Sequence, residues 1–173
     1  MTSPADWQDF AEMTGAASSA LTGLLFVAVS LNAARIAGHQ GLRASAAQTL
    51  VLFISPLVMA AALLTPGQPD AVLGGELIAT GLGASWVLLA TGRVKNSLGD
   101  DDRRLIAIFD SHVTNVVVML LFVAGGIILA CGEGAGLYFL LPASLVAFVS
   151  GVINAWHFLL PPAGARPVAA KDE

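Results

Sequence analysis

Five long apolar stretches, separated by short polar segments, dominate the chain. They cover 13–34, 48–65, 71–92, 112–131 and 137–159. A helix needs about 20 mostly apolar residues to cross the roughly 30 Å hydrocarbon core of a bilayer. The pattern therefore predicts an all-α, polytopic membrane protein. We expect a single domain over 1–173, built as a bundle of five transmembrane helices.

The composition agrees with this pattern. Of the 173 residues, 56% are hydrophobic and only 12% are charged, and the net charge is -4. A typical soluble domain carries about 25% charged residues, and a nucleic-acid binder needs a basic patch. We therefore expect the lipid bilayer as a partner and exclude nucleic acid.

The basic residues are divided unequally between the two sides of the predicted bundle. When the connections are assigned alternately to two sides, the side that holds the amino terminus, 66–70 and 132–136 has no Lys or Arg. All eight basic residues fall on the other side: Arg35, Arg43, Arg93, Lys95, Arg103, Arg104, Arg166 and Lys171. The positive-inside rule makes that side cytoplasmic. The sequence thus predicts a multi-pass protein of the cell inner or plasma membrane, with its amino terminus outside and its carboxyl terminus inside.

Two local features predict the shape of individual helices. Pro56 lies mid-way through the second stretch, where the missing amide hydrogen predicts a kink. The hydroxyl of Ser55 is expected to bond a carbonyl that the proline frees. Three acidic residues, Asp100 to Asp102, favour a helix N-terminus, so the fourth helix is expected to begin near Asp101.

Small residues recur every four positions on three of the stretches. They are Gly15, Ser19 and Gly23 on the first; Gly75, Ala79 and Gly83 on the third; and Ala143, Ala147, Gly151 and Ala155 on the fifth. Such stripes let helix backbones approach closely in a membrane. The favoured interpretation is packing within one five-helix bundle. The alternative is that one stripe joins copies of the chain into a homo-oligomer.

Glu76 is the carboxylate placed deepest within an apolar stretch. It lies about two turns, roughly 9 Å, beyond Asp70, a plausible N-cap of the third helix. Ionisable residues at such depth are costly and often mark ion paths. Thr80 follows one turn later and is expected to share its face. The alternative is that Glu76 extends to the outer headgroups or bonds a neighbouring helix.

A polar layer is predicted near the cytoplasmic ends of the helices. Its members come from four helices: Asn32, Gln48, Asp110, His112, Asn115, Asn154 and His157. Asn115 and Asn154 are expected to lie deepest. Amides at such positions often bond across helices and fix the packing, which is the favoured interpretation. The alternative is a cytoplasmic vestibule or ligand site, in which His112 and His157 titrate near neutral pH.

The sequence lacks the motifs of several enzymes and metal sites. No phosphate-binding glycine-rich loop with a following lysine occurs, and no Gly-x-Ser-x-Gly nucleophile elbow. Asp110 and His112 are two residues apart, which places them on different faces of a helix. We therefore expect no enzyme activity, no cofactor and no metal.

Three segments resemble known proteins. They are ALTGLLFVAVSLN at 20–32, QTLVLF at 48–53 and NAWHFLLP at 154–161. These segments resemble small, mostly uncharacterised multi-span membrane proteins of bacteria. The resemblance implies a bacterial inner-membrane location and supplies no activity.

Two classes of function fit these observations. The first is a homo-oligomeric channel or transporter for a small ion or solute, with Glu76, Thr80 and the cytoplasmic Asn and His layer on the path. The second is a scaffold or regulatory subunit that transports nothing and binds another membrane protein. A transport role predicts that Glu76 and Asn154 face a hydrated cavity. A scaffold role predicts a dry bundle with a small-residue stripe that faces lipid.

Overall fold

The structure is a computed structural model that describes residues 4–95 and 111–159. Over these ranges the chain is all-helical, without a strand. The elements in order are η1 (Pro4–Trp7), α1 (Gln8–Leu31), α2 (Ala33–Gly38), α3 (Gln40–Leu63), α4 (Asp70–Lys95), α6 (Ser111–Ala130), η4 (Gly134–Phe139) and α7 (Leu140–Leu159). The expected start of a helix near Asp101 lies outside the described residues.

Each predicted apolar stretch contains a long helix, but several helix ends differ from the prediction. α3 begins at Gln40, not at 48, because its first turns mix polar residues with small and apolar ones, which continue the helix but interrupt the apolar pattern. A short helix, α2, occupies the link before it and was not predicted. The last stretch opens with the 3-10 helix η4, and the α-helix begins at Leu140.

Three segments are long and apolar enough to cross a membrane: Gln8–Leu31, Gln40–Leu63 and Gly134–Trp156. Thr114–Ala130 is equally a continuous apolar helix, but it is shorter within the described ranges. Length and hydropathy of these helices indicate a membrane protein.

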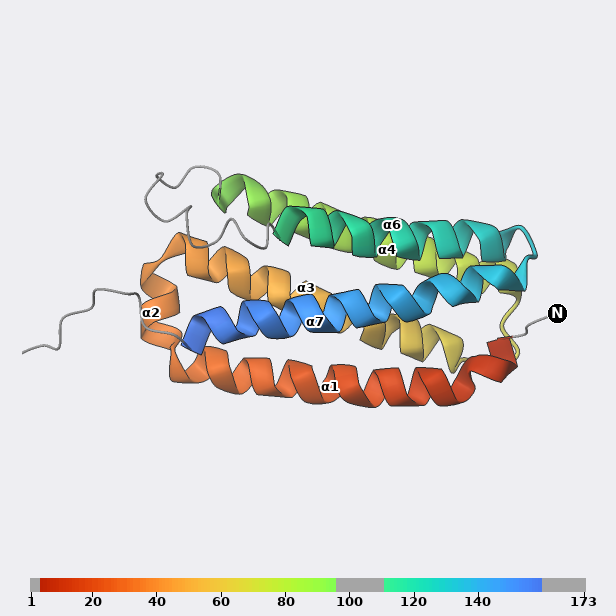
Figure 1. Cartoon of the computed structure of the whole chain (residues 1–173), viewed down its shortest axis with the longest axis horizontal. Helices are drawn as coiled ribbons and strands as arrows, with labels where there is room; N and C mark the ends of the chain where they lie inside the picture. Colours follow the sequence, from red (N-terminus) through yellow and green to blue (C-terminus); the bar gives the residue numbers. More distant parts are fainter. Residues whose placement is uncertain (1–3, 96–110, 160–173) are drawn as a thin grey trace, which may run out of the picture.

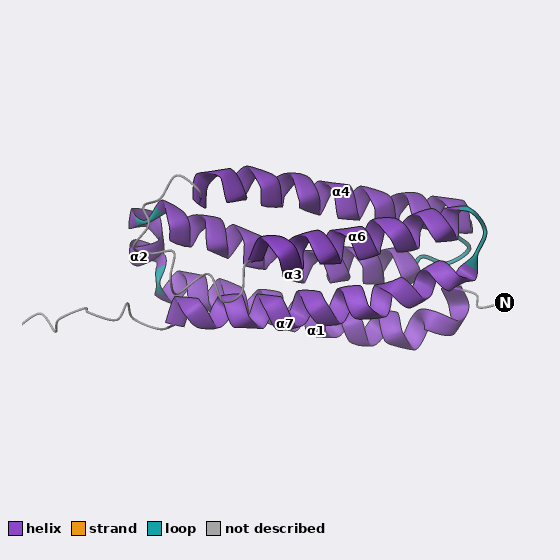
Figure 2. Ribbon diagram, turned by 45° about the horizontal axis from the view of Figure 1, so that its top comes forward, coloured by secondary structure: helices purple, strands orange, loops and turns teal. Residues whose placement is uncertain are grey.

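The long helices run side by side as an elongated bundle (Figure 1). α3 packs against α1, α4 and α7, while α6 packs against α4 and α7. The paired helices α4 and α6 lie next to each other in both views (Figures 1 and 2). One end of the bundle, which we call the Trp7 end, holds η1, the α3–α4 link and η4. The opposite end, which holds α2, we call the α2 end.

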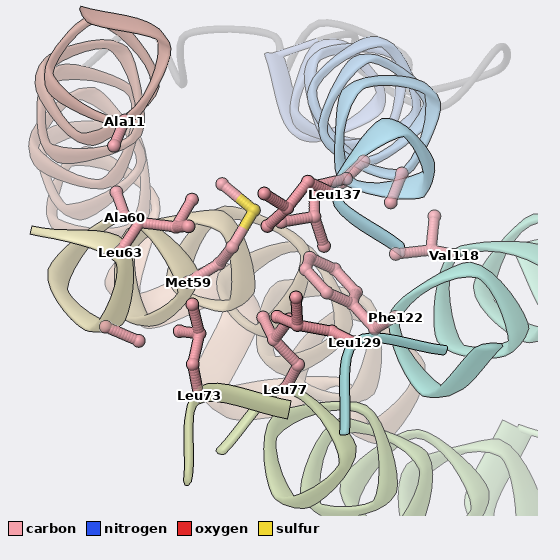
Figure 3. Close-up of a cluster of buried hydrophobic side chains, with 14 of the residues drawn as sticks. Ala11, Met59, Ala60, Leu63, Leu73, Leu77, Val118, Phe122, Leu129 and Leu137 are labelled. Carbon is pink, nitrogen blue, oxygen red and sulfur yellow. The ribbon is translucent and has the colours of Figure 1, made fainter. Parts of the chain in front are cut away.

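A continuous apolar core fills the bundle, mostly in the half toward the Trp7 end. Figure 3 shows its side chains converging from α1, α3, α4, α6 and η4. The largest fully buried ones include Phe122, Met59, Leu77, Leu129 and Leu137. A second, smaller cluster around Leu25 and Phe53 joins α1, α3 and α7 nearer the α2 end. Dispersion contacts in such close packing hold membrane helices together, since lipid offers little hydrophobic driving force between them.

Glycines set the close approach of α4 to α6. A Cβ atom added to Gly74 would lie 2.6 Å from the carbonyl oxygen of Gly126, and one added to Gly126 would lie 2.7 Å from the carbonyl oxygen of Gly74. About two turns further along α4, a Cβ on Gly81 would lie 2.8 Å from the side chain of Val123. The two backbones therefore touch directly, which only glycine permits.

Pro56 lies inside α3 and is buried. Its missing amide hydrogen leaves the carbonyl of Leu52 without the usual donor, because helical bonds join residue i to residue i−4. The hydroxyl of Ser55 donates instead to the carbonyl of Val51, at 2.7 Å. A second serine, Ser18 of α1, donates to the carbonyl of Phe53 and so ties α1 to α3 beside the proline.

Candidate functional site

Asn115 is the most unusual polar residue inside the bundle. It is only 3% exposed. It shares a face of α6 with Val118, Phe122 and Leu129, at helical spacings that bring all four to the core. Among the described residues, neither its amide nitrogen nor its amide oxygen has a hydrogen-bond partner. A buried unpaired polar group of this kind costs about 1–3 kcal/mol, so it calls for a functional explanation.

Other polar side chains are buried in the same half of the bundle. Gln48 and Thr49 of α3 are 1% and 0% exposed. Thr49 donates to the carbonyl of Ser45 within its own helix, at 2.9 Å. By contrast, the half toward the Trp7 end is filled by the leucines and Phe122 of the main core. The half toward the Trp7 end also buries hydroxyl groups, on Thr14 and Ser144, so the α2 half is distinguished only by its buried amides, Gln48 and Asn115.

The remaining members of that layer are placed differently. Asn32 ends α1, and its amide nitrogen donates to the carbonyl of Ala28 at 2.9 Å, within the same helix. Asn154 is half-buried on α7. His112 and His157 belong to α6 and α7, but their side chains lie outside the described part, as does Asp110 altogether. Asn115 is therefore the layer member whose burial and unsatisfied amide point to a ligand.

Glu76 does not face the interior of the bundle. It is exposed on α4, on the side turned away from α6. The hydroxyl of Thr80 donates to the backbone carbonyl of Glu76 at 2.8 Å, so the Thr80 hydroxyl has its partner within the same helix. Leu73 and Leu77, the neighbours of Glu76 that do point inward, are fully buried. Glu76 is exposed on the outside of the bundle and Asn115 is buried inside it, so one path through the interior of a single bundle does not pass both.

The stripe on α7 faces the core. Ala143 and Ala147 are fully buried, and a Cβ on Gly151 would lie 2.9 Å from Cδ1 of the Phe53 ring. Ala155 is half-buried. This stripe lets α7 pack closely against α3.

The stripe on α1 is split between two environments. A Cβ on Gly15 would lie 3.3 Å from Cβ of Ala60, so Gly15 faces α3. Ser19 is exposed, and no described atom lies within 4 Å of a Cβ on Gly23. The contact with α3 is continued by Thr14 and Ser18, which are buried.

The stripe on α4 faces away from the other helices. Gly75, Ala79 and Gly83 are exposed, and a Cβ on either glycine would meet no described atom within 4 Å. Packing inside the bundle, the favoured interpretation, therefore does not explain this stripe. The glycines that pack α4 against α6 are Gly74 and Gly81. Gly74 comes one residue before Gly75 of the stripe, and Gly81 comes two residues before Gly83. The spacing of seven between Gly74 and Gly81 was a signal available in the sequence.

An apolar groove of about 250 Å³ lies beside this stripe, between α3 and α4. Its α3 wall is formed by Leu50, Val51, Ile54, Ser55 and Val58, and its α4 wall by Ala79, Thr80, Gly83, Ala84 and Val87. The groove is open to the surroundings of the bundle. Because the α4 wall consists partly of small residues, another group can approach the α4 backbone closely here.

Metal binding finds no support in the described ranges. No group of three or more His, Cys, Asp or Glu side chains there is arranged to hold an ion. Cys131, the single cysteine of the chain, is exposed at the end of α6.

Comparisons with known proteins returned no match: no family model, no curated protein and no solved structure is similar to this chain. The resemblance to small bacterial membrane proteins thus stays an expectation. Every functional argument has to come from the chain itself.

Proposed function

We propose that this chain is a five-span protein of the bacterial inner membrane, with its amino terminus outside and its carboxyl terminus in the cytoplasm. Five helices of 20 to 26 residues run side by side in one bundle. Arg35 and Arg43 lie at the α2 end, where α4 also ends with Arg93 and Lys95. The turns at the Trp7 end carry acidic residues, among them Asp70 and Glu133. This asymmetry follows the positive-inside rule, with the α2 end in the cytoplasm.

Native Cys131 provides a direct test of this orientation. A membrane-impermeant maleimide should label Cys131 in intact cells, because it is exposed at the Trp7 end. In a Cys131→Ser background, Gly38→Cys at the α2 end should react only after the cells are permeabilised. Labelling of Gly38→Cys in intact cells would overturn the orientation.

For its activity, we propose that the protein is a homo-oligomeric channel or transporter for a small ion or solute. The observation that carries this proposal is Asn115, whose amide is buried on the core face of α6 with both polar atoms unpaired. Polar groups inside a membrane bundle are costly and often mark solute and ion paths, and Asn115 makes no hydrogen bond to a described residue that would explain it by packing. An amide offers one acceptor and two donor hydrogens, so it can bind either a cation or a neutral polar solute.

The placement of Asn115 defines how the path would be arranged. Asn115 would form the site on the cytoplasmic side, together with the predicted members Asn154, His112 and His157. The leucine-rich core toward the Trp7 end would close the bundle on the outside. Glu76 and Thr80 face outward, so they would lie on a path only where two copies meet.

The proposal can be tested by flux into proteoliposomes, with K⁺, Na⁺, H⁺, Cl⁻, urea and glycerol as probes. Asn115→Leu removes the amide and keeps the branched shape of the side chain, and it should lower the flux about ten-fold, the effect of about 1.4 kcal/mol. The same change should leave stability equal or higher, because it removes an unpaired buried group.

Asn32→Leu is the matched control, because the Asn32 amide is bonded within its own helix. It should leave the flux close to that of the native protein. Equal flux from native protein and Asn115→Leu would remove Asn115 from the path. A native protein that moves none of the probes would contradict the transport proposal.

A scaffold or regulatory subunit is the second candidate, and one observation favours it. The small-residue face of α4 points outward, where a partner helix can approach closely. This candidate predicts no flux from the native protein. It also predicts that an unrelated membrane protein is bound in place of a second copy, which mass measurement distinguishes.

A further inference from the structure

We propose that Asn115 binds a small uncharged molecule that both donates and accepts hydrogen bonds. Water and dissolved primary amides are the two sources of this chemistry. The inference deepens the proposed function by naming the class of solute at its site. It rests on that proposal only for the transport of the bound molecule, because binding can be measured without transport.

The two polar atoms of the Asn115 side chain require opposite partners. Its oxygen accepts hydrogen bonds and its nitrogen donates two. Neither atom has a partner among the described residues, although the residue is only 3% exposed. A cation would pair with the oxygen and be repelled by the N–H groups, whereas an anion would do the reverse. A neutral molecule with a donor and an acceptor satisfies both atoms, whichever way the amide is turned.

The buried side chains that the structure describes carry no charge that would offset that of an ion. Within the described residues, no Asp, Glu, Lys, Arg or His side chain is buried. The buried polar side chains there are all neutral: Thr14, Ser18, Gln48, Thr49, Ser55, Asn115 and Ser144. An ion is costly to transfer into such an interior unless an opposite charge compensates it. A neutral solute avoids this cost.

The protons of most of the buried hydroxyl groups are already used within the protein. Thr49, Ser55 and Ser144 donate to backbone carbonyls of their own helices, at 2.9, 2.7 and 2.8 Å. Ser18 donates to a backbone carbonyl of α3. Asn115 differs from these hydroxyl groups because both its donor and its acceptor are open to a ligand.

Asn115 lies where the leucine-rich core ends on the side of α2. It comes about one turn before Val118 on α6, and Gln48 comes about one turn before Leu52 on α3. Val118 and Leu52 belong to the same core cluster. Since α3 and α6 both run toward the Trp7 end (Figure 1), the two buried amide side chains lie on the same side of that cluster. A ligand would therefore reach Asn115 from the α2 half, and it has to be small to be enclosed there.

A primary amide complements the Asn115 side chain with two hydrogen bonds. The carbonyl oxygen of the solute accepts from Nδ2, while an N–H group of the solute donates to Oδ1, so the two planar groups pair side by side. A water molecule can accept from Nδ2 or donate to Oδ1. Buried waters typically bond to polar groups that otherwise lack partners.

Nuclear magnetic resonance of the native protein in lipid nanodiscs tests the binding directly. With isotopically labelled asparagine, the side-chain signals of Asn115 are identified by their loss in Asn115→Leu. Acetamide should shift these signals and leave those of Asn32 unchanged, because the Asn32 amide nitrogen already donates to the carbonyl of Ala28. Potassium chloride at the same concentration should shift neither. At about pH 8, histidine side chains with the usual pKa of about 6.5 are uncharged.

Two isomeric solutes separate the need for a donor from the effect of size. Propionamide and N,N-dimethylformamide have the same atoms and a carbonyl acceptor each, but only propionamide has N–H groups. Propionamide should shift the Asn115 signals, and N,N-dimethylformamide should not. If water is the partner, magnetisation is instead transferred between water and the Asn115 amide, and neither isomer shifts the signals.

Transport is measured separately, by the osmotic swelling of proteoliposomes. The native protein should pass water or acetamide, and Asn115→Leu should lower the protein-dependent rate about ten-fold or more. Binding at Asn115 without any flux would contradict the transport proposal and leave this inference intact.

Other results would overturn the inference itself. They are a shift of the Asn115 signals by potassium chloride but not by acetamide, equal shifts with the two isomers, a hydrogen bond from the Asn115 amide to another group of the protein, or the absence of both a solute shift and a contact with water. A potassium or chloride flux that is lost in Asn115→Leu would also overturn it, while supporting the transport proposal.

Discussion

Gly74 and Gly75 of α4 are adjacent in the sequence but lie in completely different environments. Gly74 lies against the backbone of α6, with a Cβ position 2.6 Å from the carbonyl oxygen of Gly126. Gly75, the next residue, points into open space. On a helix, one residue turns the side-chain direction by about 100°. α4 therefore has one glycine surface that packs the fold and another that no described helix covers.

This comparison yields a graded series of substitutions. What matters at each glycine is whether a new Cβ atom would meet backbone, a movable side chain or nothing. We expect the effect on the free energy of unfolding to follow that order. Measurements in dilute detergent, where single copies predominate, isolate the effect on the fold.

Gly74→Ala should give the largest effect. The new methyl group would lie 2.6 Å from the oxygen of Gly126 and 2.8 Å from the amide nitrogen of Ala130, both of them backbone atoms. The α4–α6 pair has to separate, so the substitution should destabilise the fold by about 3 kcal/mol. Unfolding in increasing SDS, followed by circular dichroism, measures it. A loss below about 1 kcal/mol would show that the contact is looser than described.

Gly151→Ala should have the second-largest effect, because its new methyl group meets a side chain. Atoms of the Phe53 ring occupy the space, with Cδ1 at 2.9 Å. A ring can rotate or shift, so we expect a loss of about 1–2 kcal/mol. The double variant Gly151→Ala with Phe53→Leu should recover part of this loss relative to the sum of the two single variants, which a double-mutant cycle detects.

Gly83→Ala should raise the free energy of unfolding, whereas the two substitutions above lower it. No described atom lies near the new methyl group, and alanine is the better helix former, so a single copy should gain about 0.5–1 kcal/mol. Destabilisation of the monomer would show that this face packs inside the bundle. The matched position Gly23→Ala on α1 should give the same gain.

Gly15→Ala should have the smallest effect. Its new methyl group would lie 3.3 Å from Cβ of Ala60, slightly too close, so a few tenths of an ångström of adjustment are needed. The helix-propensity gain offsets this cost, and we expect a net change within about 0.5 kcal/mol of zero. Thermal unfolding of the two proteins side by side is the appropriate measurement, and a large loss would place α1 closer to α3 than described.

The positions of the long helices could be predicted from the sequence, whereas the side that each residue faces could not. Apolar runs of sufficient length locate the helices to within several residues, because the bilayer sets the length of a span. Their ends were less accurate, as at Gln40, because polar residues at the interface continue a helix beyond the apolar run. The short helix α2 has only six residues, too few to show an apolar periodicity that would predict it.

The facing directions failed for a physical reason. In a soluble helix, polar and apolar sides differ and reveal the buried face. In α4, residues on both sides are apolar or small, so hydropathy does not distinguish the stripe of Gly75, Ala79 and Gly83 from the pair Gly74 and Gly81. Glu76 likewise gave no sign of which way it points. Asn115 and Asn154 were predicted to lie deepest in the membrane, which stays a prediction; within the bundle Asn115 is buried and Asn154 is half-buried.

An aromatic cluster at the Trp7 end has a consequence for the order in which the chain is assembled. Trp7 meets Phe10 and Tyr138 edge to face, with ring centroids 5.4 and 5.2 Å apart. Tyr138 belongs to η4, so the first turn of the chain is joined to the last connection to be synthesised. During insertion, this aromatic contact can form only after the hairpin of α6 and α7 has entered the membrane. The fluorescence of Trp7 would thus respond to the arrival of η4, and a chain that stops before 134 would leave Trp7 without its contact to Tyr138.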